Sequence, residues 1–88
     1  MGILSAFLGN RSYEDNQIFH WIMFDDLEKN GYRPIQSHGI WDFNYELCWK
    51  IPDIELKKLL IFAKKYGQES VIYANNNILG FSECVYEV

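Results

Sequence analysis

The segment from Trp41 to Ile51 most constrains the fold, because apolar and mostly polar residues alternate along it without a break. Side chains on a β-strand point alternately to the two faces of a sheet, so this alternation predicts a strand with one apolar face. The chain's own helices, another protein, or both must cover that face. The residues predicted to line it are Trp41, Phe43, Tyr45, Leu47, Trp49 and Ile51.

A second interpretation divides this segment into parts. It is about twice as long as a usual strand, which favours a hairpin turn at Asp42-Phe43-Asn44. Trp41 and Phe43 would then lie near the tip of a loop, where large aromatic residues are more typical of binding than of a core. Both interpretations stay open on the sequence alone.

The first helix is predicted by signals at both of its ends. Ser12 and Asp15 have the spacing of a capping box, with Asp in place of the usual Glu. Asn30-Gly31 is a stop signal, because glycine readily adopts the conformation that ends a helix. We therefore expect a helix over Tyr13 to Lys29.

A second helix and several short strands complete the pattern. Asp53 is the expected N-cap of a helix over Ile54 to Tyr66, and Gly67 is its expected stop. The Gln68 amide is expected to satisfy the last helix carbonyls. The predicted strands are Ile3 to Leu8, Tyr32 to Gln36, Val71 to Ala74, Ile78 to Phe81 and Cys84 to Val88, with turns at Ser37-His38-Gly39 and Asn75-Asn76-Asn77.

The order of these elements predicts an α+β fold. Strand, helix, strand, strand, helix, strand is the split βαβ arrangement of ferredoxin-like folds. We expect a βαββαβ two-layer sandwich, with two helices on one face of an antiparallel sheet and a short C-terminal strand extension. The second strand contains Pro34, which cannot donate to a sheet ladder, so it should lie on an edge, with the first and third strands central. Residues 1–88 are expected to form a single domain.

The charge balance limits what the chain binds. It has 12 acidic and 8 basic residues and a formal net charge of −4. This sign argues against a nucleic-acid binder, whose affinity depends on neutralising phosphates. The N-terminal apolar run is too short for a signal sequence or a membrane span. We therefore expect no membrane partner, reduced cysteines and a cytoplasmic location.

Both helices are predicted to carry apolar residues on their outer faces, in a chain rich in aromatic side chains. The core stripe of the first helix is Phe19, His20, Met23, Phe24 and Leu27, and that of the second is Leu56, Leu59, Leu60 and Ala63. The outward residues are Ile18, Trp21, Ile22 and Ile61, with Ile54 near the start of the second helix. Such a patch indicates an interaction site unless a turn, the C-terminal tail or the Trp41 loop folds over Trp21.

Three acidic residues near the end of the first helix form a second candidate surface. Asp25, Asp26 and Glu28 are expected to be a solvated acidic face. Together with Glu14 and Asp15 they would alternatively imitate the phosphate spacing of a nucleic acid.

The sequence contains no recognisable catalytic or metal-binding motif. Zinc ligands are available in His20, His38, Cys48 and Cys84, but no two of them have the close sequence spacing of structural zinc sites. His20 falls on a core stripe and is expected to be a satisfied, partly buried histidine. Ser37, His38 and Asp42 are close in sequence, yet nothing marks an oxyanion site beside them. We expect no metal, no cofactor and no catalytic residues.

Several local patterns are shared with a known family. They are Leu4-Ser5-Ala6-Phe7, Ser12-Tyr13-Glu14-Asp15-Asn16, Asn30-Gly31-Tyr32-Arg33-Pro34-Ile35 with Gly39 after it, and Phe62 to Tyr73, in which Tyr66-Gly67-Gln68-Glu69-Ser70 is the most specific part. With these patterns the chain resembles a family of small bacterial and phage proteins classed as a domain of unknown function. The resemblance implies a phage or bacterial cytoplasmic origin and transfers no catalytic residues.

The sequence as a whole predicts a non-enzymatic protein-binding module whose partner is another protein or a second copy. If the origin is a phage, the expected purpose is to block a host protein, such as a defence factor, in the host cytoplasm. The alternatives are a small-molecule binder or enzyme with a site between the sheet and the Trp41 loop, and an acidic nucleic-acid mimic. The predicted partner-binding residues are Ile18, Trp21, Ile22, Trp41, Phe43 and Ile61.

Overall fold

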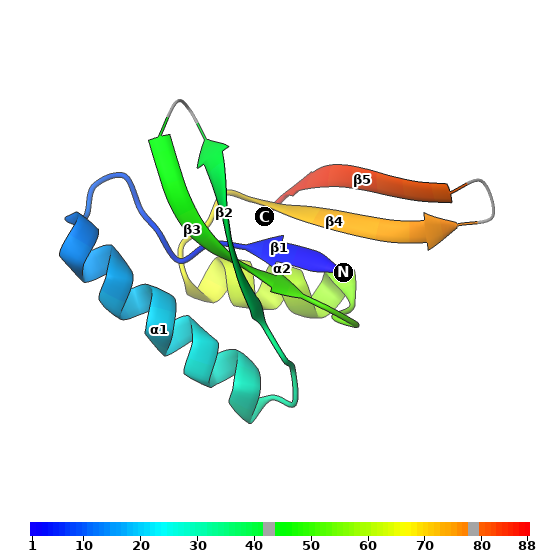
Figure 1. The fold of residues 1–88 in the computed structure, drawn as a ribbon, viewed down its shortest axis with the longest axis horizontal. Helices are drawn as coiled ribbons and strands as arrows, with labels where there is room; N and C mark the ends of the chain where they lie inside the picture. The colour runs from blue at the N-terminus through cyan, green and yellow to red at the C-terminus, as the bar shows by residue number, and fades with distance from the viewer. Residues whose placement is uncertain (42–43, 78–79) are drawn as a thin grey trace.

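The computed structural model describes residues 1–41, 44–77 and 80–88, with side chains for residues 1–40, 45–74 and 84–88 (Figure 1). Within these ranges there are two helices and a five-stranded antiparallel sheet in the order β2-β3-β1-β4-β5, which is an α+β class. The elements are β1 (Gly2–Leu4), α1 (Tyr13–Lys29), β2 (Ile35–Trp41), β3 (Asn44–Ile51), α2 (Leu56–Lys65), β4 (Ser70–Asn77) and β5 (Gly80–Glu87).

The bounds of α1 confirm the prediction from its end signals. The Ser12 Oγ accepts a hydrogen bond from the Asp15 backbone N–H at 3.1 Å, which satisfies one of the free donors of the first turn. At the other end Asn30 is the C-cap, and Gly31 follows with φ of 89°. Glycine adopts this left-handed conformation at little energetic cost, so the chain leaves the helix at this position.

The start of α2 differs from the prediction. Asp53 is not the N-cap; it has φ of 61° and lies in a turn before the helix. The N-cap is Glu55, whose side chain makes no capping hydrogen bond. The prediction was wrong because Asp, besides favouring N-cap positions, also tolerates the left-handed conformation of turns. At the C-terminal end Gly67 has φ of 72° and acts as the predicted stop.

The hairpin interpretation of the Trp41 to Ile51 segment is confirmed. β2 pairs with β3, and the pairing ends with Trp41 opposite Asn44. Asn44, predicted in the turn, belongs to β3, and Asp42 and Phe43 lie outside the described residues. The turn predicted at Ser37-His38-Gly39 is wrong, since these residues lie inside β2 and pair with β3. Pairing with a neighbouring strand overrides a weak local turn signal.

The C-terminal hairpin also differs from the prediction. Asn75-Asn76-Asn77 belongs to β4 and pairs with β5, so the predicted turn is wrong. β5 is a single strand from Gly80 to Glu87, where two shorter strands were predicted. Ile78, the start of one of those predicted strands, lies outside the described residues.

The edge and the centre of the sheet follow the sequence signals. β2, which begins next to Pro34, is an edge strand, and β1 lies between β3 and β4. β1 is shorter than predicted and ends at Leu4, while the following residues to Phe7 stay buried without strand pairing.

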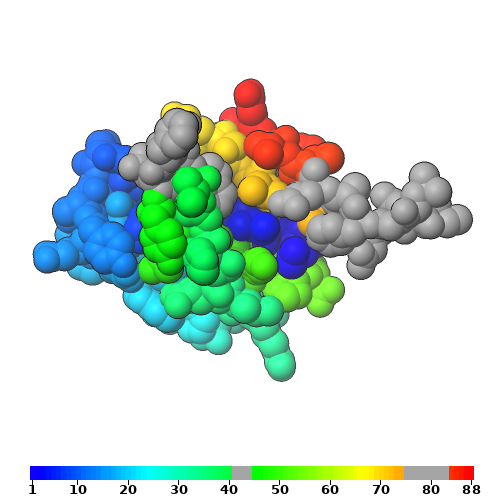
Figure 2. All heavy atoms as spheres, turned by 45° about the horizontal axis from the view of Figure 1, so that its top comes forward, coloured from blue at the N-terminus to red at the C-terminus, as the bar shows by residue number. Residues whose placement is uncertain are grey.

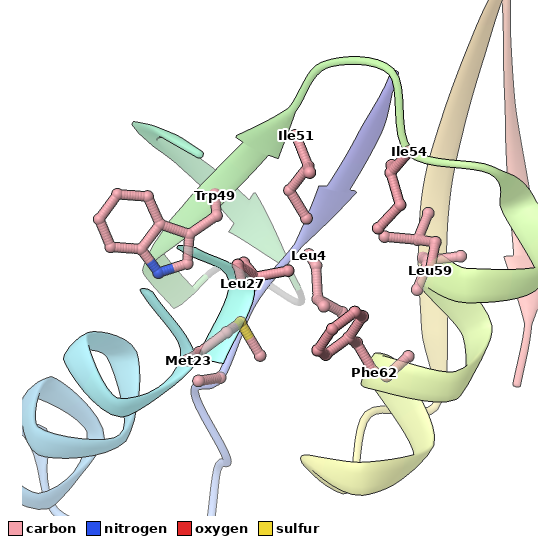
Figure 3. Close-up of a cluster of buried hydrophobic side chains, with 11 residues drawn as sticks. Leu4, Met23, Leu27, Trp49, Ile51, Ile54, Leu59 and Phe62 are labelled. Carbon is pink, nitrogen blue, oxygen red and sulfur yellow. The ribbon is translucent and has the colours of Figure 1, made fainter. Parts of the chain in front are cut away.

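The core lies between one face of the sheet and both helices (Figure 3). Leu4 of β1 pairs with Trp49 of β3, and both side chains point toward the helices. Ile51, two residues further along β3, lies on the same face of the sheet. Ile54, predicted on the outer side of α2, is instead buried, because it precedes the helix. The remaining core residues are Ala6, Met23, Leu27, Leu59, Phe62, Ala63 and Val71.

Candidate interaction site

The outer face of α1 exposes three large apolar side chains that were predicted to project from it. Ile18 is 57% exposed, Trp21 48% and Ile22 46%. Residues three and four apart lie side by side on a helix surface, so these three form one contiguous patch. We call Ile18, Trp21 and Ile22 the α1 triad. No described turn, tail or loop has buried it.

Trp21 is anchored on one side and open on the other. Its ring meets Trp49 edge-on with centroids 5.2 Å apart and also contacts Phe24 at 5.5 Å. It therefore lies on the flank of α1 and does not point straight outward. A half-buried aromatic ring with restricted rotation loses little entropy when a partner covers its free side, as binding anchors typically do.

An open groove lies between α1 and the C-terminal end of α2. It encloses about 720 Å³ and begins at Ile22 of the α1 triad. We call it the α1–α2 groove. Its apolar lining includes Leu8, Phe19 and Ile22, and its charged lining residues are Arg11, Asp25, Asp26, Lys29 and Lys65. Protein interfaces combine an apolar centre with a polar rim, and this lining supplies both kinds of group.

Phe19 and Arg11 build one side of this groove. The Arg11 guanidinium carbon lies 3.9 Å from the Phe19 ring centroid, which is cation–π geometry. An Arg11 Nη1 hydrogen also bonds to the Ala6 carbonyl at 3.2 Å. The two contacts hold the guanidinium over the ring. Phe19 was predicted to lie in the core, but it is partly exposed at the edge of the helix stripe.

Asp26 closes the other side of the groove by joining the two helices. Its Oδ2 accepts hydrogen bonds from Lys65 Nζ at 2.7 Å and from the Tyr66 hydroxyl at 2.9 Å. Burial opposes ionisation of this carboxyl, but the bonds from Lys65 and Tyr66 outweigh it and lower the Asp26 pKa. Burial and the neighbouring carboxylate raise the Tyr66 pKa. The Asp26 carboxylate therefore links α1 to the C-terminal end of α2.

The three predicted acidic residues do not form one solvated face. The Asp26 side chain is only 19% exposed and is paired with Lys65 across the groove. Glu28, two positions along the helix, points to the opposite side because successive residues turn by about 100°. Asp25 lines the groove, and Glu28 is exposed. The expected solvated acidic face is therefore wrong for Asp26.

Of the other predicted partner-binding residues, the structure describes the side chain of Ile61 alone. Ile61 is 54% exposed on α2, as predicted, but it is not among the residues that line the groove. Phe43 and the side chain of Trp41 lie outside the described residues. The structure therefore brings together the α1 triad and the groove, and it leaves Ile61 apart from the groove.

His20 is a buried histidine that is only half satisfied. Its Nε2 lies 2.9 Å from the Gln36 Oε1, whereas its Nδ1 is buried and has no hydrogen-bond partner among the described residues. An unpaired lone pair costs less than an unpaired N–H, so we assign the neutral form with the proton on Nε2. Burial lowers the His20 pKa, and the bond to Gln36 opposes that shift only in part. The expectation of a fully satisfied His20 was therefore wrong.

The candidate metal ligands and thiols among the described residues lie apart from one another. Over the described residues, no three His, Cys, Asp or Glu side chains come together as metal ligands. Cys48 is buried and Cys84 exposed, and both are free thiols. Burial raises the Cys48 pKa more than the hydrogen bond with Ser37 lowers it. Ser37 and His38 are neighbours in a strand, so their side chains leave opposite faces of the sheet.

Two side-chain amides within the patterns that suggested a family resemblance have structural partners. The Asn16 side chain accepts from the Leu8 N–H at 2.9 Å and donates to the Leu8 carbonyl at 3.1 Å. The Gln68 Nε2 donates to the Phe7 carbonyl at 2.9 Å, not to the helix carbonyls as predicted. Both amides hold the buried segment that follows β1. The fold therefore gives Asn16 and Gln68 a structural role.

The sheet face opposite the core carries a row of four apolar residues and one lysine that the sequence analysis did not identify. The strand pairing aligns Ile35, Lys50, Ile3, Ile72 and Val85 across all five strands. Ile35 and Val85 are exposed at the two ends of the row. Each residue is unremarkable in its own strand, and only the register shows the alignment.

Comparisons with known proteins leave the family open. No family model, no curated protein and no solved structure matches the chain. The resemblance to small phage and bacterial proteins therefore stays a prediction. In the part of the chain that the structure describes, neither helix is long and apolar enough to cross a lipid bilayer.

The groove itself was missed at the sequence level. Arg11 and Leu8 precede α1, and nothing in their spacing indicates that they meet Phe19 and the end of α2. One signal was available: Phe19 lies at the margin of the predicted core stripe, where a side chain reaches the surface as often as the core.

Proposed function

We propose that this chain is a non-enzymatic protein-binding module whose partner packs on the α1 triad and extends into the α1–α2 groove. The observation that carries the proposal is the continuity of Ile18, Trp21 and Ile22 with the groove, through Ile22. Large apolar residues that are exposed side by side usually mark an interaction surface. The finer fold assignment, ferredoxin-like with an added C-terminal strand, belongs to this proposal and is supported by the strand order.

The chemistry of the groove selects the kind of partner segment. Asp26 is already neutralised by Lys65, which leaves Arg11 and Lys29 beside Asp25 around an apolar floor. An apolar segment with acidic flanks complements this lining best. If the chain is phage-encoded, the partner we propose is a host protein, such as a defence factor, that presents such a segment in the host cytoplasm.

Affinity capture with matched variants tests this proposal. Ile18→Asp/Ile22→Asp places charge in the α1 triad, and we expect it to abolish capture of a partner that the native chain retains. Lys57→Asp/Lys58→Asp, at exposed positions on α2, is the control and should leave that capture intact. A partner retained equally by both double variants would show that α1 is not the binding surface.

One observation favours a small ligand as a second candidate. A volume of about 720 Å³ falls within the range of ligand pockets, roughly 300–1,000 Å³. Native mass spectrometry of the purified chain would detect a bound metabolite. Its loss in an Arg11→Ala variant would assign it to the groove.

A further inference from the structure

The outer edge of β2 lacks the features that usually protect an edge strand. From Ile35 to Trp41 the strand contains no Asp, Glu, Lys, Arg or Pro, and it pairs with β3 without a bulge. Natural edges are usually protected by such residues, by bulges or by a covering element. Ile40 is 74% exposed, and the green atoms of β2 lie at the front of the molecule in Figure 2. This edge is therefore open to another strand.

The pairing with β3 defines which backbone groups this edge offers. Trp41 and Asn44 are separated by two residues, and a pair that closes so short a connection exchanges both of its N–H···O=C bonds. Hydrogen-bonded and non-hydrogen-bonded pairs alternate along an antiparallel ladder. The N–H and C=O groups of Gln36, His38 and Ile40 therefore point away from β3.

We infer that β2 pairs with β2 of a second copy of this chain, antiparallel, across a two-fold axis at His38. In this register His38 faces His38 of the partner subunit, and Gln36 faces Ile40 of the partner subunit. Every outward backbone group of β2 then meets a complementary one, as an isologous interface requires. The uncharged strand places no like charges opposite each other.

The other edge of the sheet does not offer the same self-pairing. β5 contains Glu83 and Glu87 and no basic residue. Pairing of β5 with itself would bring these like charges together, which is a common protection against edge association. The contrast between the two edges selects β2.

One flank of the α1 helix lies toward the proposed interface at β2. One flank of α1 faces α2, because Asp26 bonds to Lys65. α2 contacts β1 and β4, and α1 contacts β3, so the other flank of α1 lies toward β2. Trp21 lies on that other flank, with its ring half exposed. Joining two sheets at β2 brings both Trp21 flanks to the same side of the extended sheet.

Charge complementation at position 38 tests the inference and its register. We expect the native chain to sediment as a dimer and the His38→Glu and His38→Lys variants, each alone, as monomers. An equimolar mixture of the two variants should dimerise again, because opposite charges then meet at the axis. The His38 side chain is exposed, so neither variant should disturb the fold. The control Val85→Glu, on the β5 edge, should remain dimeric.

A backbone variant provides a second, independent measurement. His38→Pro removes an outward N–H without removing a bond to β3, so it should give a folded monomer with native circular dichroism. A monomeric native chain overturns the inference, as does a dimer that survives both charged variants. A mixture that stays monomeric overturns the register at His38. The test does not involve Ile18 or Ile22, so its failure is distinguishable from failure of the proposed function.

Discussion

Trp49 holds His20 in two ways. Its Nε1 donates a hydrogen bond to the His20 carbonyl at 3.0 Å, and its indole stacks on the imidazole with centroids 4.2 Å apart and an interplanar angle of 10°. The contact joins β3 to the middle of α1. It therefore fixes which side of α1 is buried, and by consequence which side presents Ile18 and Ile22.

Trp49→Phe should lower the free energy of unfolding by about 1–3 kcal/mol. The smaller ring removes the N–H donor and leaves space beside His20 in a closely packed core. Urea denaturation followed by circular dichroism measures the change. Trp21→Phe, at a half-exposed ring, is the control and should cost less than about 1 kcal/mol. Equal losses in the two variants would contradict the anchoring role of Trp49.

The stability of the fold should decrease as the pH is lowered, because His20 is harder to protonate in the folded chain. Its folded-state pKa lies below its ordinary value of 6.5, so the unfolded chain binds the proton more readily. This contribution is fully present above pH 6.5 and is lost as pH falls from there toward the folded-state pKa. Urea midpoints at a series of pH values should show the decline. His20→Gln, which cannot be protonated, should flatten it; an unchanged slope in that variant would assign the effect elsewhere.

Asp26→Asn should destabilise the contact between the two helices by about 1–2 kcal/mol, mainly through the charged hydrogen bond from Tyr66. Lys65→Gln should cost less than about 1 kcal/mol, because the Lys65 side chain is largely exposed and its ion pair is screened by water.

The Asp26 contribution also depends on pH. Because the folded-state pKa of this carboxyl is lowered, the stabilisation is present above the unfolded value of 3.8 and is lost as pH falls through the folded value. Acid titration of the unfolding midpoint checks this. A native-like acid profile in Asp26→Asn would contradict it.

Gly2→Ala should destabilise the fold by about 1–3 kcal/mol through overpacking. A Cβ at this position would lie 2.7 Å from Leu59 Cδ2 and 2.9 Å from Ile54 Cγ2, and both side chains are buried. Gly9→Ala is the matched control, because a Cβ there meets nothing within 4 Å. Thermal denaturation of the pair should separate them clearly. Equal melting temperatures for the two variants would show that the core near β1 accommodates the added methyl group without strain.

The parts of the fold that were predictable have strong local causes. Ser12 and Gly31 define α1 because a capping hydrogen bond and a left-handed residue act within one turn of the chain. Pro34 predicted an edge strand, because proline has no backbone N–H to donate to a neighbouring strand. These signals need no knowledge of distant residues.

The parts that were not predictable depend on partners far along the chain. Asn75-Asn76-Asn77 is extended because β5 pairs with it, and Ser37-His38-Gly39 because β3 does. The same holds for the site: the exposure of the α1 triad follows from helix periodicity, whereas the groove needs the end of α2 to arrive beside Phe19. Periodicity predicts a face, but only packing creates a concave surface.

The burial of Cys48 has a practical consequence. In the native state a thiol-specific alkylating agent should modify Cys84 alone. When the chain unfolds around Cys48, both thiols become accessible to the agent. The mass of the adduct then counts one modification or two for each molecule. Transient opening of this sheet is thus recorded covalently by the chain's own sulfurs, without an attached dye or an engineered residue.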